Sequence, residues 1–194
     1  MKKKLMTVLA LVLVIALSVA GTYAYLTSQA SVKNTFTVGN VAITMDETDV
    51  DNSTPDANRD VANAYKLIPG TTYTKDPIIH VAATSEQCYL FVKVENDIAG
   101  AETTEAGKTV AAQLAANGWS LVDGQTNIYV YKDAVNGGAN VNVFENFTVS
   151  KDISNDALAA AADGKTITVT ACAVQAEGFA DAAAAYASGA VKFA

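Results

Sequence analysis

Apolar and polar residues alternate along most of this chain, which is the pattern of half-buried β-strands. The alternation is clearest over residues 88–95, where Cys88, Leu90, Val92 and Val94 share one face and the other face is more polar. Comparable β-prone stretches, separated by turn residues, occupy residues 25–32, 34–38, 41–45, 73–81, 119–122, 128–131, 141–149 and 165–175. About eight strands joined by turns predict an all-β fold, a jelly-roll-like β-sandwich.

Three alanine-rich stretches interrupt this alternation and predict short helices, over residues 109–117, 156–162 and 180–187. Gly118 is expected to end the first of them, because glycine readily adopts the positive φ of a helix C-terminus. Residues 46–60 are acidic and polar, and they predict a loop.

The N-terminus has the three parts of a secretory signal peptide, and we expect it to be helical. Lysines at positions 2–4 precede an uncharged apolar run over residues 5–20, and small residues follow at 21–24. This arrangement predicts cleavage between Ala24 and Tyr25. A retained membrane anchor is the alternative, because the uncharged stretch reaches the ~20 residues that cross a bilayer.

The length of 194 residues fits one domain after the signal peptide, because domains hold about 100–200 residues. We therefore predict a signal peptide over residues 1–24 and a single domain over residues 25–194. The formal net charge is −7, and it becomes −10 without Lys2, Lys3 and Lys4, since 10 basic and 20 acidic residues remain. So acidic a chain argues against nucleic acid as a partner and against electrostatic binding to anionic lipid.

Four carboxylates close together in the sequence are the candidate metal ligands, and calcium is the ion that such oxygen donors prefer. The spacing lacks the glycine and the distal glutamate of a calcium-binding loop, so a solvated acidic loop is the favoured interpretation. The four residues are Asp46, Glu47, Asp49 and Asp51.

The single histidine, His80, restricts the catalytic chemistry that the chain can perform. A zinc peptidase of the HExxH type needs two histidines on one helix face. A catalytic histidine of another kind needs a positioned nucleophile or acid, and no such motif accompanies His80. We therefore expect His80 to be a structural or surface residue. We also expect no catalytic residue and no cofactor.

Cys88 and Cys172 leave two alternatives open. An even number of cysteines in an exported protein permits a disulfide, whereas free cysteines in strands pack as small apolar groups. The sequence does not fix the distance between the two Cα atoms, on which a disulfide depends.

Two N-terminal segments resemble the export and N-terminal signature of the TasA/camelysin family, residues 21–26 (GTYAYL) and residues 34–41 (NTFTVGNV). Further similar segments follow in the same order at residues 68–71, 75–77, 89–94, 118–119, 129–131, 144–149 and 173–179. The family consists of surface and biofilm-matrix proteins of Gram-positive bacteria. The resemblance rests on the order and coverage of these segments rather than on any one of them.

This resemblance implies a jelly-roll domain, export through a signal peptidase of the SipW type, and a location in the extracellular matrix or at the cell surface. It also implies assembly with other copies of the chain into fibres, in which an N-terminal strand of one subunit completes a sheet of the next. Other matrix proteins are further candidate partners. A membrane is involved only during export, unless the signal peptide is retained.

Residues 25–38 are the candidate exchanged strand, because cleavage frees the start of this β-prone segment and an extended segment can add to a sheet edge. Leu26 and Val32 are in phase with each other, as are Phe36 and Val38. The alternative is that the segment forms the first strand of its own domain. The residues expected to form the assembly strand are Tyr25, Leu26, Val32, Phe36 and Val38.

A secreted structural protein that forms fibres is the leading interpretation of the chain. A secreted metallo-endopeptidase is the first alternative, because some members of the family carry that label, but the lone histidine does not favour it. A monomeric surface adhesin or ligand-binding module is the second alternative.

Overall fold

A computed structural model describes residues 2–26, 39–54 and 57–193 of the chain. Residue contacts divide the chain into two units, 1–38 and 39–194. The first unit contains α1 (Lys2–Leu26), whose N-terminal part exposes its apolar side chains, for example Leu5 at 73%. Among the described residues, no helix combines the length and the apolar character needed to cross a membrane.

The expected cleavage site lies in the last turns of α1, because this helix continues through Tyr25 and Leu26. The sequence predicted an extended segment from Tyr25 onward, so the described start of that segment is helical instead. The other residues of the expected assembly strand, Val32, Phe36 and Val38, lie outside the described residues.

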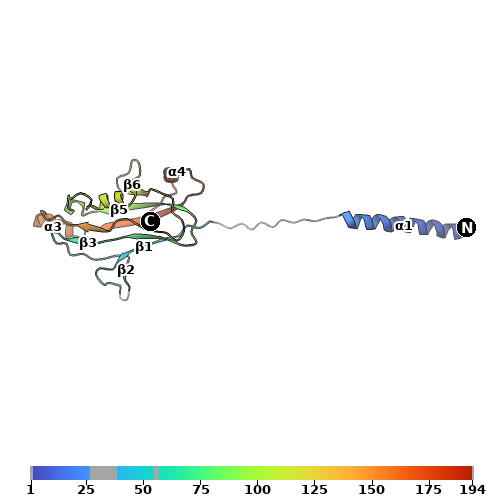
Figure 1. The fold of residues 1–194 in the computed structure, drawn as a ribbon, viewed down its shortest axis with the longest axis horizontal. Coiled ribbons are helices and arrows are strands. Elements are labelled where there is room, and N and C mark those ends of the chain that lie inside the picture. The colour runs from blue at the N-terminus through green and yellow to red at the C-terminus, as the bar shows by residue number, and fades with distance from the viewer. Residues whose placement is uncertain (1, 27–38, 55–56, 194) are drawn as a thin grey trace. The chain divides into compact units, whose positions relative to one another are not determined.

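The second unit is mostly β-structure, as the sequence predicted, and all its strand pairs are antiparallel (Figure 1). One sheet has the order β2-β1-β4-β8, a second has the order β10-β5-β7-β6, and β3 pairs with β9. The strands are β1 (Ile43–Thr48), β2 (Arg59–Asp60), β3 (Thr72–Thr74), β4 (Ile78–Val81), β5 (Cys88–Asn96), β6 (Trp119–Leu121), β7 (Ile128–Tyr131), β8 (Asn140–Asn142), β9 (Asn146–Thr148) and β10 (Ile167–Gln175).

Short helices lie at the three places where the alanine-rich stretches predicted them, α2 (Val110–Ala116), α3 (Asn155–Ala162) and α4 (Ala182–Ala187). Each has a side-chain N-cap. The hydroxyls of Thr109 and Ser154 accept hydrogen bonds from backbone N–H groups of the first turn, and Asp181 Oδ1 does the same for α4. Gly118, at φ +88°, follows the end of α2 as predicted. A 3-10 turn, η1, spans Ala99–Ala101.

One cluster of buried apolar side chains joins all three sheets of this unit. It contains Ile79 of β4, Val92 of β5 and Phe147 of β9, and Leu114 of α2 packs into it. Trp119 of β6 is 2% exposed, and its indole N–H donates to the Asn142 carbonyl at 2.9 Å. Burial of these side chains supplies the main driving force for folding of residues 39–193.

One face of β5 is more buried than the sequence predicted. Cys88, Leu90, Val92 and Val94 are buried on one face, as predicted. The other face, predicted to be wetter, contains Phe91, which is fully buried in a second cluster with Val174 and Ala185. The alternation could not reveal that α4, from the far end of the chain, covers this face.

Two predicted strands, residues 73–81 and 141–149, are each divided between two sheets. The first becomes β3 and β4, and the second becomes β8 and β9. Because β3 pairs with β9 while β4 pairs with β8, the two segments pass from one sheet to the other next to each other. Residues 46–60 are also not entirely a loop, since β1 extends to Thr48 and β2 begins at Arg59.

Cys88 and Cys172 are both free, so the disulfide alternative is not what the structure contains. In the pairing of β5 with β10, Cys88 lies opposite Gln175 and Cys172 lies opposite Phe91. Side chains alternate between the faces of a strand, so the two thiols point to opposite faces of the sheet. Cys88 belongs to the main core, and Cys172 packs beside the cluster under α4.

Candidate functional site

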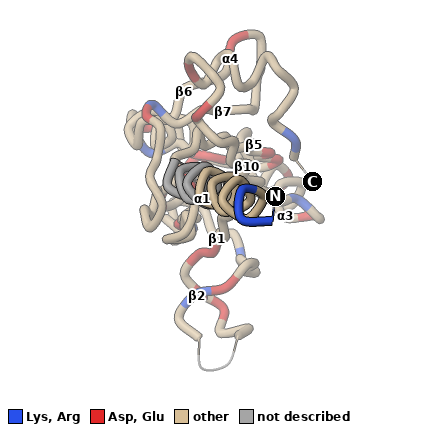
Figure 2. Tube along the Cα trace, turned by 90° about the vertical axis from the view of Figure 1, so that its right-hand side faces the viewer, with Lys and Arg blue, Asp and Glu red and all other residues tan. Residues whose placement is uncertain are grey.

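The acidic segment that was expected to be a solvated loop is held by ion pairs in and around β1 and β2. Figure 2 shows basic and acidic positions next to each other in this part of the fold. Arg59, the only arginine of the chain, forms ion pairs with Asp46 and with Asp76. Its Nη2 also donates to the carbonyl oxygens of Asp46 and Asp76, each at 3.1 Å. A single guanidinium therefore ties β2 to β1 and to the segment before β4.

These contacts explain the ionisation of the two aspartates. Burial raises the pKa of Asp46, but hydrogen bonds from Arg59 and His80 outweigh this effect and leave the pKa below its ordinary value. Burial likewise raises the pKa of Asp76, but hydrogen bonds from the backbone N–H and hydroxyl of Thr48, and from Arg59, lower it overall. Both groups are therefore carboxylates at neutral pH.

His80 has the structural position that the sequence predicted, in β4 between β1 and β8. Its Nδ1 lies 2.7 Å from Asn140 Oδ1, and its Nε2 lies 3.1 Å from Asp46 Oδ1. Both neighbours accept hydrogen bonds, so the doubly protonated imidazole fits this place best. The hydrogen bonds to Asp46 and Asn140 accordingly raise the pKa of His80.

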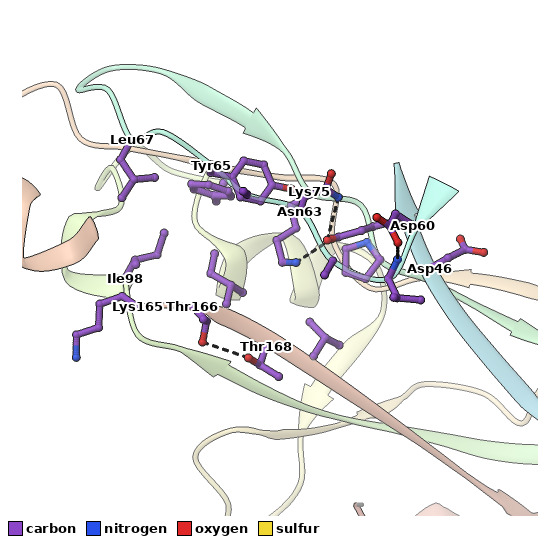
Figure 3. A pocket seen from close by; sticks show the side chains of 18 of the residues that line it. Asp46, Asp60, Asn63, Tyr65, Leu67, Lys75, Ile98, Lys165, Thr166 and Thr168 are labelled. Carbon is purple, nitrogen blue, oxygen red and sulfur yellow. Dashed lines mark hydrogen bonds and ion pairs between the residues drawn. The ribbon is translucent and has the colours of Figure 1, made fainter. Parts of the chain in front are cut away.

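Glu47 forms a second, more buried cluster with Lys75 and Asn63. The Glu47 side chain is 5% exposed and the Lys75 side chain 13%. Lys75 Nζ donates to Glu47 Oε2 at 2.8 Å, and Asn63 Nδ2 donates to Glu47 Oε1 at 3.1 Å (Figure 3). Glu47 is one of the carboxylates that the sequence indicated, whereas its partners Lys75 and Asn63, 28 and 16 residues away, carry no local signal in the sequence.

The four candidate calcium ligands do not converge on one point. Asp46 faces Arg59 and His80, while Glu47 faces Lys75 and Asn63. The other two accept backbone hydrogen bonds, Asp49 from Thr54, and Asp51 from Ser53 and Ala64. In the described part of the chain, no group of three or more His, Cys, Asp or Glu side chains is arranged to hold a metal ion.

A cavity of about 380 Å³ lies beside these clusters, and we call it the β1–β10 cavity. Met45, Asp46 and Glu47 of β1 line one wall, and residues 165–169 at the start of β10 line another. Figure 3 shows the labelled side chains of Thr166 and Thr168 across the cavity from those of Asn63 and Lys75. The remaining wall is largely apolar and includes Tyr65, Leu67, Ile98, Phe147 and Ala161.

The outer edge of β10 borders this cavity. At the two ends of the β5–β10 pairing, Asp97 N donates to Thr166 O at 3.0 Å, and Ala176 N donates to Gln87 O at 2.8 Å. Hydrogen-bonded pairs alternate along an antiparallel ladder, so the even-numbered residues of β10 bond to β5 and the odd-numbered ones point their backbone groups outward. Among the described residues, none forms a backbone hydrogen bond with this outer edge.

The sequence matches one known protein family over most of its length. The family model described as camelysin metallo-endopeptidase matches residues 1–136. The chain belongs to the TasA/camelysin family. No curated protein and no solved structure gave a match.

Members of the camelysin family are secreted or surface-associated proteins, and the family description includes a metal-dependent peptidase activity. In the described part of this camelysin-family chain, the His, Cys, Asp and Glu side chains are not arranged to form such a metal centre. Its one histidine directs both ring nitrogens at Asn140 and Asp46, and Asp46 also binds Arg59. No hydrolytic step follows from this arrangement.

Proposed function

We propose that this camelysin-family chain is a secreted structural protein that assembles into extracellular fibres, in the biofilm matrix or at the cell surface. Assembly would proceed by donor-strand exchange, in which residues 25–38 of one copy pair with the outer edge of β10 in the next. The outer edge of β10, with which no described residue pairs, and the β1–β10 cavity beside it are the observation that carries this proposal. Long unpaired strand edges are templates for another strand.

Backbone hydrogen bonds and the burial of apolar side chains would both stabilise a donor strand on β10. The odd-numbered residues of β10, from Ile167 to Gln175, present N–H and C=O groups that a donor strand would satisfy, at roughly 0.5–1.5 kcal/mol net per hydrogen bond. Alternate donor side chains would enter the cavity, where Met45, Phe147 and Ile167 provide apolar contacts. The predicted apolar positions of the donor are Leu26, Val32, Phe36 and Val38, and burying them removes further apolar surface from water.

We also infer that the two four-stranded sheets form the layers of a jelly-roll-like sandwich, because one buried cluster contains side chains from both. The β1–β10 cavity is then the place where a donor strand would fit between the layers. This arrangement favours a structural over a catalytic role. Export would require a signal peptidase of the SipW type, and other copies of the chain would be the principal partners.

Electron microscopy of the mature protein tests this proposal. We expect mass spectrometry of the secreted protein to give an N-terminus at Tyr25 and microscopy to show fibres. Deletion of residues 25–32 should leave a folded, soluble protein that no longer polymerises, because the acceptor edge on β10 remains. Normal fibres from the truncated protein would exclude this segment as the donor.

Two other outcomes point to the alternative functions. A mature protein that stays monomeric and binds a defined ligand would support an adhesin. Cleavage of casein by highly purified protein, sensitive to chelators and abolished by substitutions in this chain, would support the peptidase. A truncated protein that fails to fold would show that residues 25–32 belong to their own domain.

A further inference from the structure

The cluster of Glu47, Asn63 and Lys75 contains the groups needed to form an amide bond between two side chains. The Lys75 amine is a nucleophile, the Asn63 carboxamide is an electrophilic carbonyl with a nitrogen leaving group, and Glu47 is a proton acceptor and donor. Both nitrogens contact the same carboxylate, Lys75 Nζ at Oε2 and Asn63 Nδ2 at Oε1. In Figure 3, the dashed lines from Asn63 and Lys75 meet at this one carboxylate.

The Asn63 carboxamide is held in a fixed orientation. Its Oδ1 accepts a hydrogen bond from the Val50 backbone N–H at 2.7 Å, and its Nδ2 also donates to the Thr48 carbonyl at 2.9 Å. A backbone N–H on the carbonyl oxygen stabilises the negative charge that develops there when a nucleophile attacks the carbon. The electrophile is therefore positioned and polarised by the β1–β2 turn.

Two of the three groups, Glu47 and Lys75, are largely shielded from water. Glu47 is 4% exposed as a residue and the Lys75 side chain is 13% exposed. Tyr73 and Phe147 stack on each other, and Tyr65 contacts both rings edge to face, with ring centroids 5.0 to 5.9 Å apart. Tyr65 borders the same cavity as Glu47, Asn63 and Lys75. The low exposure of Glu47 and Lys75 strengthens the electrostatic interaction between these two groups.

We propose that Lys75 and Asn63 become joined by an intramolecular amide bond, with Glu47 as the catalytic proton carrier. Glu47 takes a proton from the Lys75 ammonium, and the neutral Nζ then attacks Asn63 Cγ. Lysine has a flexible four-carbon stem, so Nζ can move from the carboxylate to the adjacent carboxamide carbon without movement of the strands.

The tetrahedral intermediate collapses by breaking the Cγ–Nδ2 bond. Glu47 returns the proton to Nδ2, so the leaving group departs as ammonia. Glu47 then takes the second proton that Nζ loses on becoming an amide, and it passes this proton to the departing ammonia, which leaves as ammonium. A primary amide and an amine thus give a secondary amide and one ammonia, with no oxidant, reductant or other reactant. The product links Asn63, which follows β2, to Lys75, which lies between β3 and β4.

Such a bond would close a covalent loop over residues 63–75 and fasten the β1–β2 turn to the sheet. In Figure 1, this turn projects away from β1 within the second unit, so a covalent tie would limit its opening. Cross-links of this kind restrict the unfolded chain, as a disulfide does. This proposal concerns residues 39–193 alone and does not depend on fibre assembly.

Mass spectrometry of the full chain, purified in folded form, tests the bond directly. We expect an intact mass about 17 Da below the sequence mass, which is the loss of one ammonia. After trypsin digestion, residues 60–66 should remain joined to residues 67–93, because an acylated Lys75 is no longer a cleavage site. Recovery of the unlinked peptides at their sequence masses, from folded protein, would overturn the proposal.

Substitutions separate the roles of the three residues. Lys75→Arg keeps a cation beside Glu47 but should abolish the mass loss, and Glu47→Gln should abolish it by removing the proton carrier. Asn63→Asp should instead lose about 18 Da, because water replaces ammonia as the leaving group.

A matched control is Lys108→Arg, since the Lys108 ammonium pairs with the exposed carboxylate of Glu105. This variant should retain the full loss. A cross-link that persists in folded Glu47→Gln protein would show that Glu47 is not the proton carrier, and one that persists in folded Lys75→Arg protein would exclude Lys75 as the nucleophile. Circular dichroism of each variant establishes that it is folded.

Discussion

His80 Nε2 lies 3.1 Å from Asp46 Oδ1, across the pairing of β4 with β1. The only histidine of the chain thus binds the same carboxylate as its only arginine, Arg59. These residues stabilise the pairing of β1 with β4 beside the β1–β10 cavity, since Asp46 lines that cavity.

The contact predicts a pH-dependent contribution to stability. The folded-state pKa of His80 is raised, so its contribution is complete below the unfolded pKa and is lost as pH rises through the folded pKa. We expect His80→Gln to cost roughly 0.2–1 kcal/mol near pH 5.5 and less near pH 8.5. Urea denaturation followed by circular dichroism measures this difference, and a cost that is independent of pH would contradict the prediction.

Removal of Arg59 should destabilise the second unit more than removal of an exposed cation. Arg59→Ala leaves Asp46 and Asp76 without their shared partner and removes the Nη2 donor from two carbonyl oxygens. We expect a loss of about 1–3 kcal/mol. Lys132→Ala is the control, because Lys132 is 62% exposed and lies 3.8 Å from Asp133, and it should change the free energy of unfolding little. Equal effects of the two substitutions would contradict this interpretation.

Two proline substitutions in β10 distinguish its inner edge from its outer edge. Ala171→Pro removes an outward N–H, so the domain should fold and its assembly into fibres should fail. Thr170→Pro removes an N–H that faces β5, opposite Lys93, and should cost at least about 1 kcal/mol in the free energy of unfolding. Sedimentation measures assembly and urea denaturation measures stability. If the Ala171→Pro protein formed fibres to the same extent as the wild type, β10 would be excluded as the acceptor strand.

The two cysteines should differ in reactivity. Cys88 is fully buried, and burial raises the pKa of its thiol, whereas Cys172 is only partly buried. We expect iodoacetamide to modify Cys172 first in the folded protein and both residues in urea, as peptide mass mapping would show. In Cys172→Ser protein, modification should require unfolding. Rapid modification of Cys88 in the folded protein would contradict its position in the core.

The elements that the sequence predicted well are those with local signals. The alternation of β5 and the alanine-rich stretches of α2, α3 and α4 lie within single segments. The strand β10 was also evident, but its neighbours were not, because a sequence pattern does not show which edge of a strand stays unpaired.

The acidic segment was misinterpreted for a related reason. Its carboxylates look solvated in the sequence, whereas Arg59 binds partners 13 and 17 residues away and Lys75 binds Glu47 across 28 residues. The presence of the only arginine inside this acidic stretch was the one signal that could have indicated an ion-paired strand. The side chains of Asn63 and Lys75 gave no such signal, because their meeting at Glu47 depends on the tertiary fold.

The position of Trp119 has a practical optical consequence. It is the only tryptophan in the sequence, it is 2% exposed, and its ring centroid lies 5.1 Å from that of Tyr131. Its emission therefore reports how tightly the core of residues 39–193 is packed around this ring. Loosening of the core should shift the emission maximum to the red.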